Sequence, residues 1–129
     1  MPVTIPVTKA FLPPFQDVVS MLQGIWDSGQ LTNNGPLLKQ LEAELVPHHG
    51  TPHVLMASNG TITLQLALRA FGITGEVITT PFSYVASTTA ILWERCTPVF
   101  VDIEPDGFNI DADRIERAIT PRTQAILAT

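Results

Sequence analysis

The stretch that decides the fold is Val54-Leu55-Met56-Ala57-Ser58-Asn59-Gly60-Thr61, where an apolar run gives way to a helical pattern. That pattern continues at Leu64, Ala67, Leu68 and Phe71, which recur three or four residues apart. A strand that turns through Gly into a helix leaves the first helical N–H groups unpaired at the positive end of the helix dipole. Such an end suits a phosphate, so the stretch is the first indication of a phosphorylated ligand.

Strands and helices alternate after this point. We expect strands at 53–57, 76–79 and 98–102 and helices at 61–71 and about 84–94. A further helix, with Asp111 as N-cap and Ile115 and Ile119 on its buried face, should lead into a last strand over 125–129. This alternation predicts an α/β fold with a mostly parallel sheet flanked by helices. Because no helix follows to cover the last strand, we expect the domain to be truncated.

The first fifty residues have a different, helical pattern. An amphipathic helix is expected after Pro13-Pro14 and should close at Gly29. Pro36 should open a second helix, which Pro47 and Gly50 should end. We therefore predict an N-terminal helical segment over residues 1–50 and the first portion of an incomplete α/β domain over 51–129.

Composition excludes several classes of protein. Of the 129 residues, 45% are apolar and 15% charged, which favours a packed globular core over disorder. A net charge of −5 and only seven Lys and Arg disfavour nucleic acid as a partner. No apolar run is long enough for a membrane span, and the start lacks signal-peptide features. With a single cysteine, Cys96, no internal disulfide can form, so we expect a cytoplasmic protein.

Two places could carry chemistry. Gly60 and Thr61 could cradle a phosphate, or the same turn could be a plain N-cap made by Ser58, Asn59 or Thr61. Tyr84 follows the strand at 76–79, at the carboxyl end where α/β proteins usually bind ligands. Its ring could stack on a planar ligand or pack in the core.

Other motifs give little support. The acidic residues Asp102, Glu104 and Asp106 come close to a calcium loop, but position twelve is Asp113, not Glu, and a strand precedes the loop. The histidines at 48, 49 and 53 have no evident fourth ligand nearby, so no metal site is expected. The G-x-G-x-x-G, P-loop and G-x-S-x-G motifs are absent, which disfavours dinucleotide, NTP and hydrolase sites.

Taken in order, five blocks resemble the DegT/StrS family of nucleotide-sugar aminotransferases: Gly29–Pro36, Ser58–Thr61, Gly75–Ala86, Pro98–Ile103 and Ala118–Ile126. Within that family, Phe11–Pro14 and Ile73–Glu76 are most similar to members that form dTDP-4-amino-4,6-dideoxyglucose.

The resemblance implies part of the large domain of a fold-type-I enzyme that uses pyridoxal 5′-phosphate in deoxysugar biosynthesis. Such an enzyme is a homodimer that moves an amino group from glutamate to a nucleotide-linked keto sugar. On this template Gly60, Thr61 and the Ile62 backbone would hold the cofactor phosphate, and Tyr84 would stack on the pyridine ring.

The family's Schiff-base Lys and the Asp that pairs with the pyridinium nitrogen would lie beyond Thr129. Lys9 and Lys39 precede the α/β portion, so we expect no catalytic residue in this chain, which alone should be inactive. A keto-sugar dehydratase with His at the Lys position, and a non-catalytic fragment, remain alternatives. The identity of the sugar and nucleotide is left open.

Overall fold

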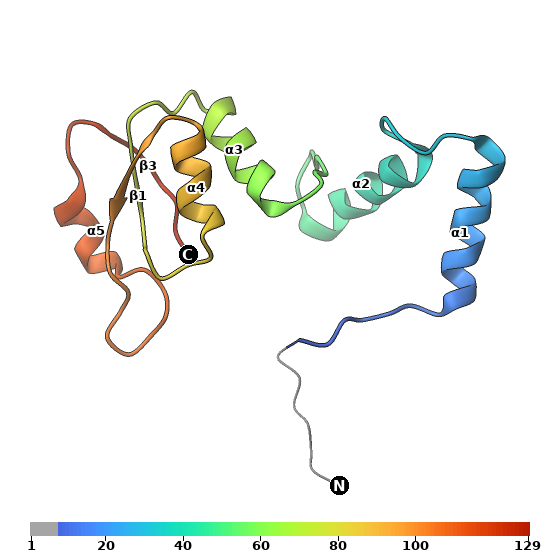
Figure 1. Ribbon diagram of the computed structural model, residues 1–129, viewed down its shortest axis with the longest axis horizontal. Helices are drawn as coiled ribbons and strands as arrows, with labels where there is room; N and C mark the ends of the chain where they lie inside the picture. The colour runs from blue at the N-terminus through green and yellow to red at the C-terminus, as the bar shows by residue number, and fades with distance from the viewer. Residues whose placement is uncertain (1–7) are drawn as a thin grey trace, which may run out of the picture. The chain divides into compact units, whose positions relative to one another are not determined.

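The computed structural model describes residues 8–129, which fall into two compact units, one ending at Met56 and the other beginning at Ala57 (Figure 1). The first unit contains α1 (Phe15–Ser28) and α2 (Pro36–His49). Gly29 ends α1 in the left-handed conformation with φ 66°, as the sequence predicts, because a residue without Cβ adopts that conformation readily.

The second helix differs from its prediction at one end. Pro36 begins α2 as expected, but Pro47 lies inside the helix, which continues to His49 and ends at Gly50 with φ 63°. The prediction that Pro47 helps to end the helix was wrong, because a proline in the last turn removes only one backbone hydrogen bond.

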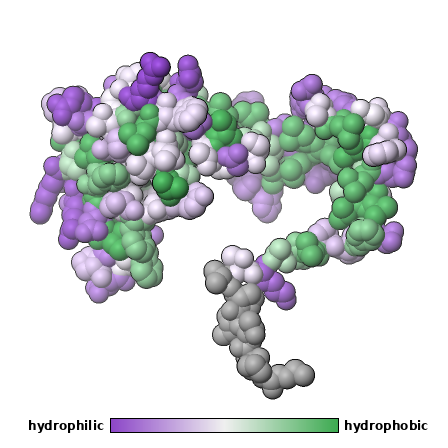
Figure 2. All heavy atoms as spheres, in the orientation of Figure 1, coloured by the Kyte–Doolittle hydropathy of each residue, from purple (hydrophilic) through white to green (hydrophobic). Residues whose placement is uncertain are grey.

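None of residues 8–56 is buried, and apolar side chains lie at the surface along α1 (Figure 2). The exposed fraction reaches 74% for Phe15 and 79% for Trp26. The amphipathic pattern therefore produced a helix whose apolar face is left uncovered by the other residues of 8–56.

The second unit is built around a parallel sheet with the strand order β2-β1-β3. Its strands are β1 (Glu76–Thr79), β2 (Thr97–Phe100) and β3 (Thr123–Ile126). Its helices are α3 (Gly60–Ala70), α4 (Ala86–Trp93) and α5 (Ala112–Ala118). The predicted α/β fold with a parallel sheet flanked by helices is confirmed.

The central strand supplies the core on both faces of the sheet. Val77 and Ile78 are fully buried and point to opposite faces, since successive strand side chains alternate. Val77 packs with Leu68 of α3 and Ile91 of α4, whereas Ile78 packs near Ile115 of α5. Figure 1 shows α5 on the other side of the sheet from α3 and α4. The connection from β1 to β2 thus covers one face and the connection from β2 to β3 the other.

Residues 53–57 form no strand, so that prediction was wrong. Leu55 is 79% exposed, and the Met56 N–H donates to the Glu42 carboxylate at 2.8 Å. A strand persists only where a neighbour completes its ladder of hydrogen bonds. Within residues 8–129 the segment finds no such neighbour.

The end of the chain follows its prediction in outline. Asp111 caps α5, as expected, by accepting the Asp113 N–H at 3.0 Å. Ile115 is on the buried face, but Ile119 is 54% exposed because the helix ends at Ala118 and the chain turns to an extended conformation at residue 119. The last strand begins at Thr123, two residues before the predicted start.

Candidate functional site

The start of α3 carries free hydrogen-bond donors. Asn59 is the N-cap, and its side-chain oxygen accepts the Ile62 N–H at 3.0 Å. Within residues 8–129 the N–H groups of Gly60 and Thr61 and the Thr61 hydroxyl have no acceptor. The helix dipole places partial positive charge at this end. Two amides and one hydroxyl are therefore available to an anion, whereas the Ile62 amide is already paired with Asn59.

The space beside Gly60 is open. A Cβ added at this residue would meet no atom within 4 Å. Its φ is not in the left-handed region, so the conformation itself does not require glycine. The missing side chain instead leaves room for a ligand to approach the backbone amides closely.

The second predicted residue, Tyr84, lies in the loop that follows β1. The residue is 80% exposed and lines a shallow hollow of about 360 Å³ together with Pro81, Phe82 and Ser83. The alternative reading, that Tyr84 packs in the core, is therefore wrong for residues 8–129. An exposed ring beside a hollow is free to stack on a planar ligand.

Both features lie at the same edge of the sheet. The helix α3 ends six residues before β1 begins, and α4 ends shortly before β2, so both helices end at the amino edge of the parallel strands. Figure 1 shows α3 and α4 side by side, and their starts therefore face the carboxyl edge, where the loop with Tyr84 also lies. Ligands of α/β proteins bind at this edge.

Two contacts in this region have no counterpart in the sequence prediction. The Ser83 and Ser87 hydroxyls hydrogen-bond at 2.8 Å, and the rings of Phe82 and Phe108 stack with centroids 5.6 Å apart. Phe108 belongs to the Asp102–Asp111 stretch, where sequence analysis considered only the carboxylates. Spacing in the sequence gives no signal for a contact between two separate loops.

The residues considered for metal binding do not gather into a site. In the part of the chain that the structure describes, no three His, Cys, Asp or Glu side chains are placed to hold a metal ion. Asp102 accepts the Ile103 N–H at 2.8 Å, and His48 and His49 contact each other edge to face. Burial, with a smaller effect of Glu94, raises the pKa of the Cys96 thiol. For the described residues, no helix has the length and apolar character needed to cross a membrane.

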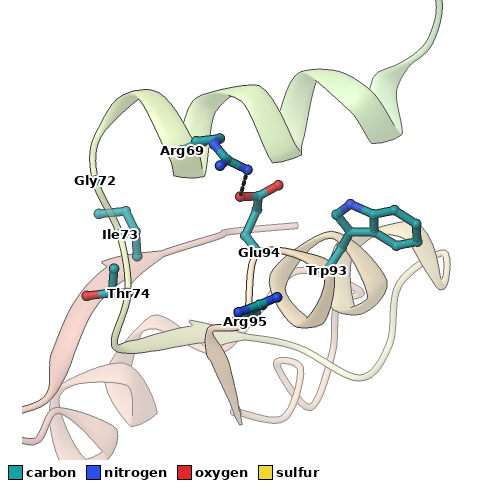
Figure 3. A pocket seen from close by; sticks show the side chains of 7 residues that line it. All are labelled: Arg69, Gly72, Ile73, Thr74, Trp93, Glu94 and Arg95. Atoms are coloured by element: carbon teal, nitrogen blue, oxygen red, sulfur yellow. Dashed lines mark hydrogen bonds and ion pairs between the residues drawn. The ribbon is translucent and has the colours of Figure 1, made fainter.

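A second cavity, of about 550 Å³, lies at the opposite edge of the sheet, where α3 and α4 end (Figure 3). Arg69 points toward Glu94, with 3.5 Å between Nη1 and Oε2, and Arg95 and Trp93 complete this side. Arginines at helix C-termini stabilise the negative ends of the dipoles. The helix ends thus account for the arginines, whereas Glu94, at the C-cap of α4, is paired with Arg69.

The family model of the DegT/DnrJ/EryC1/StrS aminotransferase family matches residues 16–129. The chain is 54% identical over 124 residues to dTDP-4-amino-4,6-dideoxy-D-glucose transaminase of Escherichia coli, covering 96% of this chain and 33% of that protein. It is 38% identical to GDP-perosamine synthase of Caulobacter vibrioides, covering 78% of this chain and 28% of that protein. The chain thus spans about a third of the length of these relatives.

Solved structures agree with this match. The structure of ntda from Bacillus subtilis with bound cofactor pmp superposes with a TM-score of 0.83 and 36% identity, over 88% of this chain and 26% of that one. The structure of DesI with its TDP-sugar product gives a TM-score of 0.81 and 38% identity, over 88% and 29%. These neighbours confirm the predicted partial fold-type-I large domain. The chain belongs to the DegT/DnrJ/EryC1/StrS aminotransferase family.

Proposed function

We propose that this chain is the cofactor-holding N-terminal portion of an aminotransferase that uses pyridoxal 5′-phosphate. The whole enzyme would move an amino group from glutamate to a nucleotide-linked 4-keto-6-deoxy sugar. The observation that carries the proposal is the pair of free N–H groups of Gly60 and Thr61 at the start of α3. Membership of an aminotransferase family supports it.

The residues present fit a phosphate. Gly60 and Thr61 offer two amides, Thr61 adds a hydroxyl, and the open space at Gly60 lets phosphate oxygens come close. Ile62 would contribute only by sharing its N–H with Asn59, so we assign it the smallest part of the three residues. Tyr84 would stack on the pyridine ring and restrict its tilt.

When bound, the cofactor supplies an electron sink that allows an amino group to pass between donor and acceptor. The part of this chain in that reaction is binding and orientation. Both of its lysines, Lys9 and Lys39, lie in the unit that ends at Met56. We infer that a lysine from outside this sequence acts on the cofactor and that the chain alone transfers no amino group.

The relatives support a proposal for the substrate class, to which we add proposals for the donor and the assembly. Identity to a dTDP-4-amino-4,6-dideoxy-D-glucose transaminase supports a dTDP-linked sugar, and we propose glutamate as donor, a cytoplasmic homodimer as the assembly, and synthesis of deoxysugars such as those of O-antigen as the role. We further propose that residues 1–50 are a helical segment ahead of the cofactor-binding portion at 51–129.

The cofactor part can be tested on ¹⁵N-labelled chain titrated with pyridoxal 5′-phosphate and, in parallel, with pyridoxal, which lacks the phosphate. We expect the amide resonances of Gly60 and Thr61 to shift with the phosphate form only, and that of Ile62 to shift less. The start of α5, capped by Asp111, serves as a control helix whose acidic cap should repel the anion. Unmoved Gly60 and Thr61 amides at millimolar cofactor would overturn the proposal.

The reaction itself needs the complete gene product. We expect ¹⁵N from labelled glutamate to appear on the 4-position of a dTDP-4-keto-6-deoxy sugar. Loss of a hydroxyl from the sugar without nitrogen transfer would favour the dehydratase alternative instead.

A further inference from the structure

The orientation of the Tyr84 ring is not fixed by contacts of its own. Within the described residues its hydroxyl makes no hydrogen bond, its ring stacks on no other ring, and 80% of the residue is exposed. The direction of the ring must therefore come from the backbone of the loop at 81–84. A ring that stacks on a ligand is effective only if that backbone is held in place.

One support for the loop comes from α4. Ser87 lies in the first turn of this helix and is buried, and its hydroxyl hydrogen-bonds the Ser83 hydroxyl at 2.8 Å. The Ser87 N–H also donates to the Tyr84 carbonyl at 3.1 Å. The residue before Tyr84 and the Tyr84 carbonyl are thereby both tied to the helix.

A second support comes from the connection between β2 and α5. The ring of Phe108 stacks on that of Phe82, with planes 15° apart. The Phe108 loop is itself closed, because Ile103 and Ile110 form an antiparallel bridge and the Glu104 N–H donates to the Asn109 carbonyl at 3.0 Å. An ordered loop thus holds the residue two positions before Tyr84.

We propose that Ser87 and Phe108 are positioning residues for Tyr84, holding the loop at 81–84 from two separate elements so that the ring meets the cofactor at a fixed angle. This inference rests on the proposed function for the role of the ring. The two supports themselves need no cofactor, so the two proposals can fail separately.

The test compares Ser87→Ala and Phe108→Ala with matched controls in the same unit. Thr89→Val removes an α4 hydroxyl whose hydrogen bonds go to the Val85 and Ala86 carbonyls. Phe71→Ala removes an exposed ring at the end of α3. The first measurement is the ¹H–¹⁵N heteronuclear NOE of Ser83 and Tyr84 without cofactor. We expect it to fall in the two test variants, as the loop gains motion, and to stay unchanged in the controls.

The second measurement is the affinity for pyridoxal 5′-phosphate. We expect it to drop about fivefold in each test variant, which is the effect of losing one aromatic pair or buried hydrogen bond. The conservative variants Ser87→Thr and Phe108→Tyr keep the hydroxyl and the aromatic ring, respectively. We therefore expect both the NOE and the affinity to be close to those of the unmodified chain. Rescue also shows that the loss is not general unfolding.

An unchanged NOE in Ser87→Ala and Phe108→Ala would overturn the positioning role. So would an affinity loss of equal size in Thr89→Val or Phe71→Ala, or a failure of both conservative variants to restore the NOE. If the NOE falls in the two test variants but the unmodified chain binds no cofactor, the two supports stand and the proposed function is overturned.

Discussion

The two edges of the same three-stranded sheet are built in opposite ways. At the amino edge, the buried Glu76 accepts from the Thr120 hydroxyl and from Arg122, and the Gln124 side chain accepts the Thr74 and Gly75 N–H groups. At the carboxyl edge, by contrast, the amides of Gly60 and Thr61 are free and Tyr84 is exposed.

The groups that stabilise the sheet and the groups that are free to bind a ligand thus lie at different edges. Polar groups that pair with one another across strands hold a sheet together but have nothing left to offer a ligand. Groups left free add little to stability and are available for binding. We therefore expect substitutions of the paired groups at the amino edge to change the free energy of unfolding, and those of the free groups at the carboxyl edge to change ligand binding.

The largest effect should come from two glycines, one at each edge. In Gly75→Ala the new Cβ would collide with the Arg122 carbonyl oxygen, whereas in Gly60→Ala it would meet nothing within 4 Å. We expect Gly75→Ala to lower the free energy of unfolding by about 3 kcal/mol. Gly60→Ala should change it by less than about 1 kcal/mol and weaken binding of pyridoxal 5′-phosphate. Urea unfolding followed by circular dichroism measures the change in the free energy of unfolding for both variants. Equal destabilisation by Gly75→Ala and Gly60→Ala would contradict the contrast between the two edges.

The next effect depends on pH. The hydrogen bond from the Thr120 hydroxyl, followed by the interactions with Arg122, holds the pKa of Glu76 below its ordinary value. A carboxyl with a lowered folded pKa stabilises the fold fully above its unfolded pKa of about 4.3. That contribution is lost as the pH falls through the lower folded value.

We therefore expect the urea midpoint to decrease as the pH is lowered through this acid range, and to decrease less steeply in Glu76→Gln. Glu116→Gln is the control, because Glu116 is exposed and makes no ion pair within residues 8–129. An equally steep acid dependence in Glu76→Gln and the unmodified chain would remove Glu76 as the cause.

The smallest effect should come from the two buried threonines at the end of β1. Thr79 Oγ1 has no hydrogen-bond partner in the described part of the chain, whereas Thr80 Oγ1 accepts the Phe82 N–H at 3.3 Å. Removing an unpaired buried hydroxyl is favourable, and removing a paired one leaves its donor unsatisfied. We expect Thr79→Val to raise the free energy of unfolding by about 1 kcal/mol and Thr80→Val to lower it by about the same amount. Effects of the same sign in both variants, measured in urea, would refute this assignment.

The sequence allowed prediction of whatever depends on neighbours along the chain. Gly29, Pro36 and Asp111 act on their own helix ends, so the first closes its helix and the other two begin theirs as expected. The alternation of strands and helices predicted the parallel sheet for the same reason. Family resemblance added the assignment of Gly60, Thr61 and Tyr84 to the cofactor, which stays a prediction.

Features that need a distant partner could not be predicted. The apolar run at 53–57 has the composition of a strand, but pairing decides whether it becomes one, and no partner lies within residues 8–129. The stack of Phe82 on Phe108 and the contacts of Glu76 with Arg122 likewise join segments far apart in the sequence. Neither residue type nor spacing indicates which of many such pairs will form.

The central place of β1 has a consequence for synthesis. This strand ends at Thr79, but both of its neighbours are translated later, and β3 is complete only at Ile126. At typical translation rates, the interval lasts roughly 2 to 10 s, whereas helices form within microseconds. During that interval α3 and α4 can fold, and β2 can pair with one side of β1 once Phe100 has been translated, but the other side has no neighbouring strand until β3 emerges. Until β3 emerges, the β3 side of β1 is therefore open to chaperones and to misassociation.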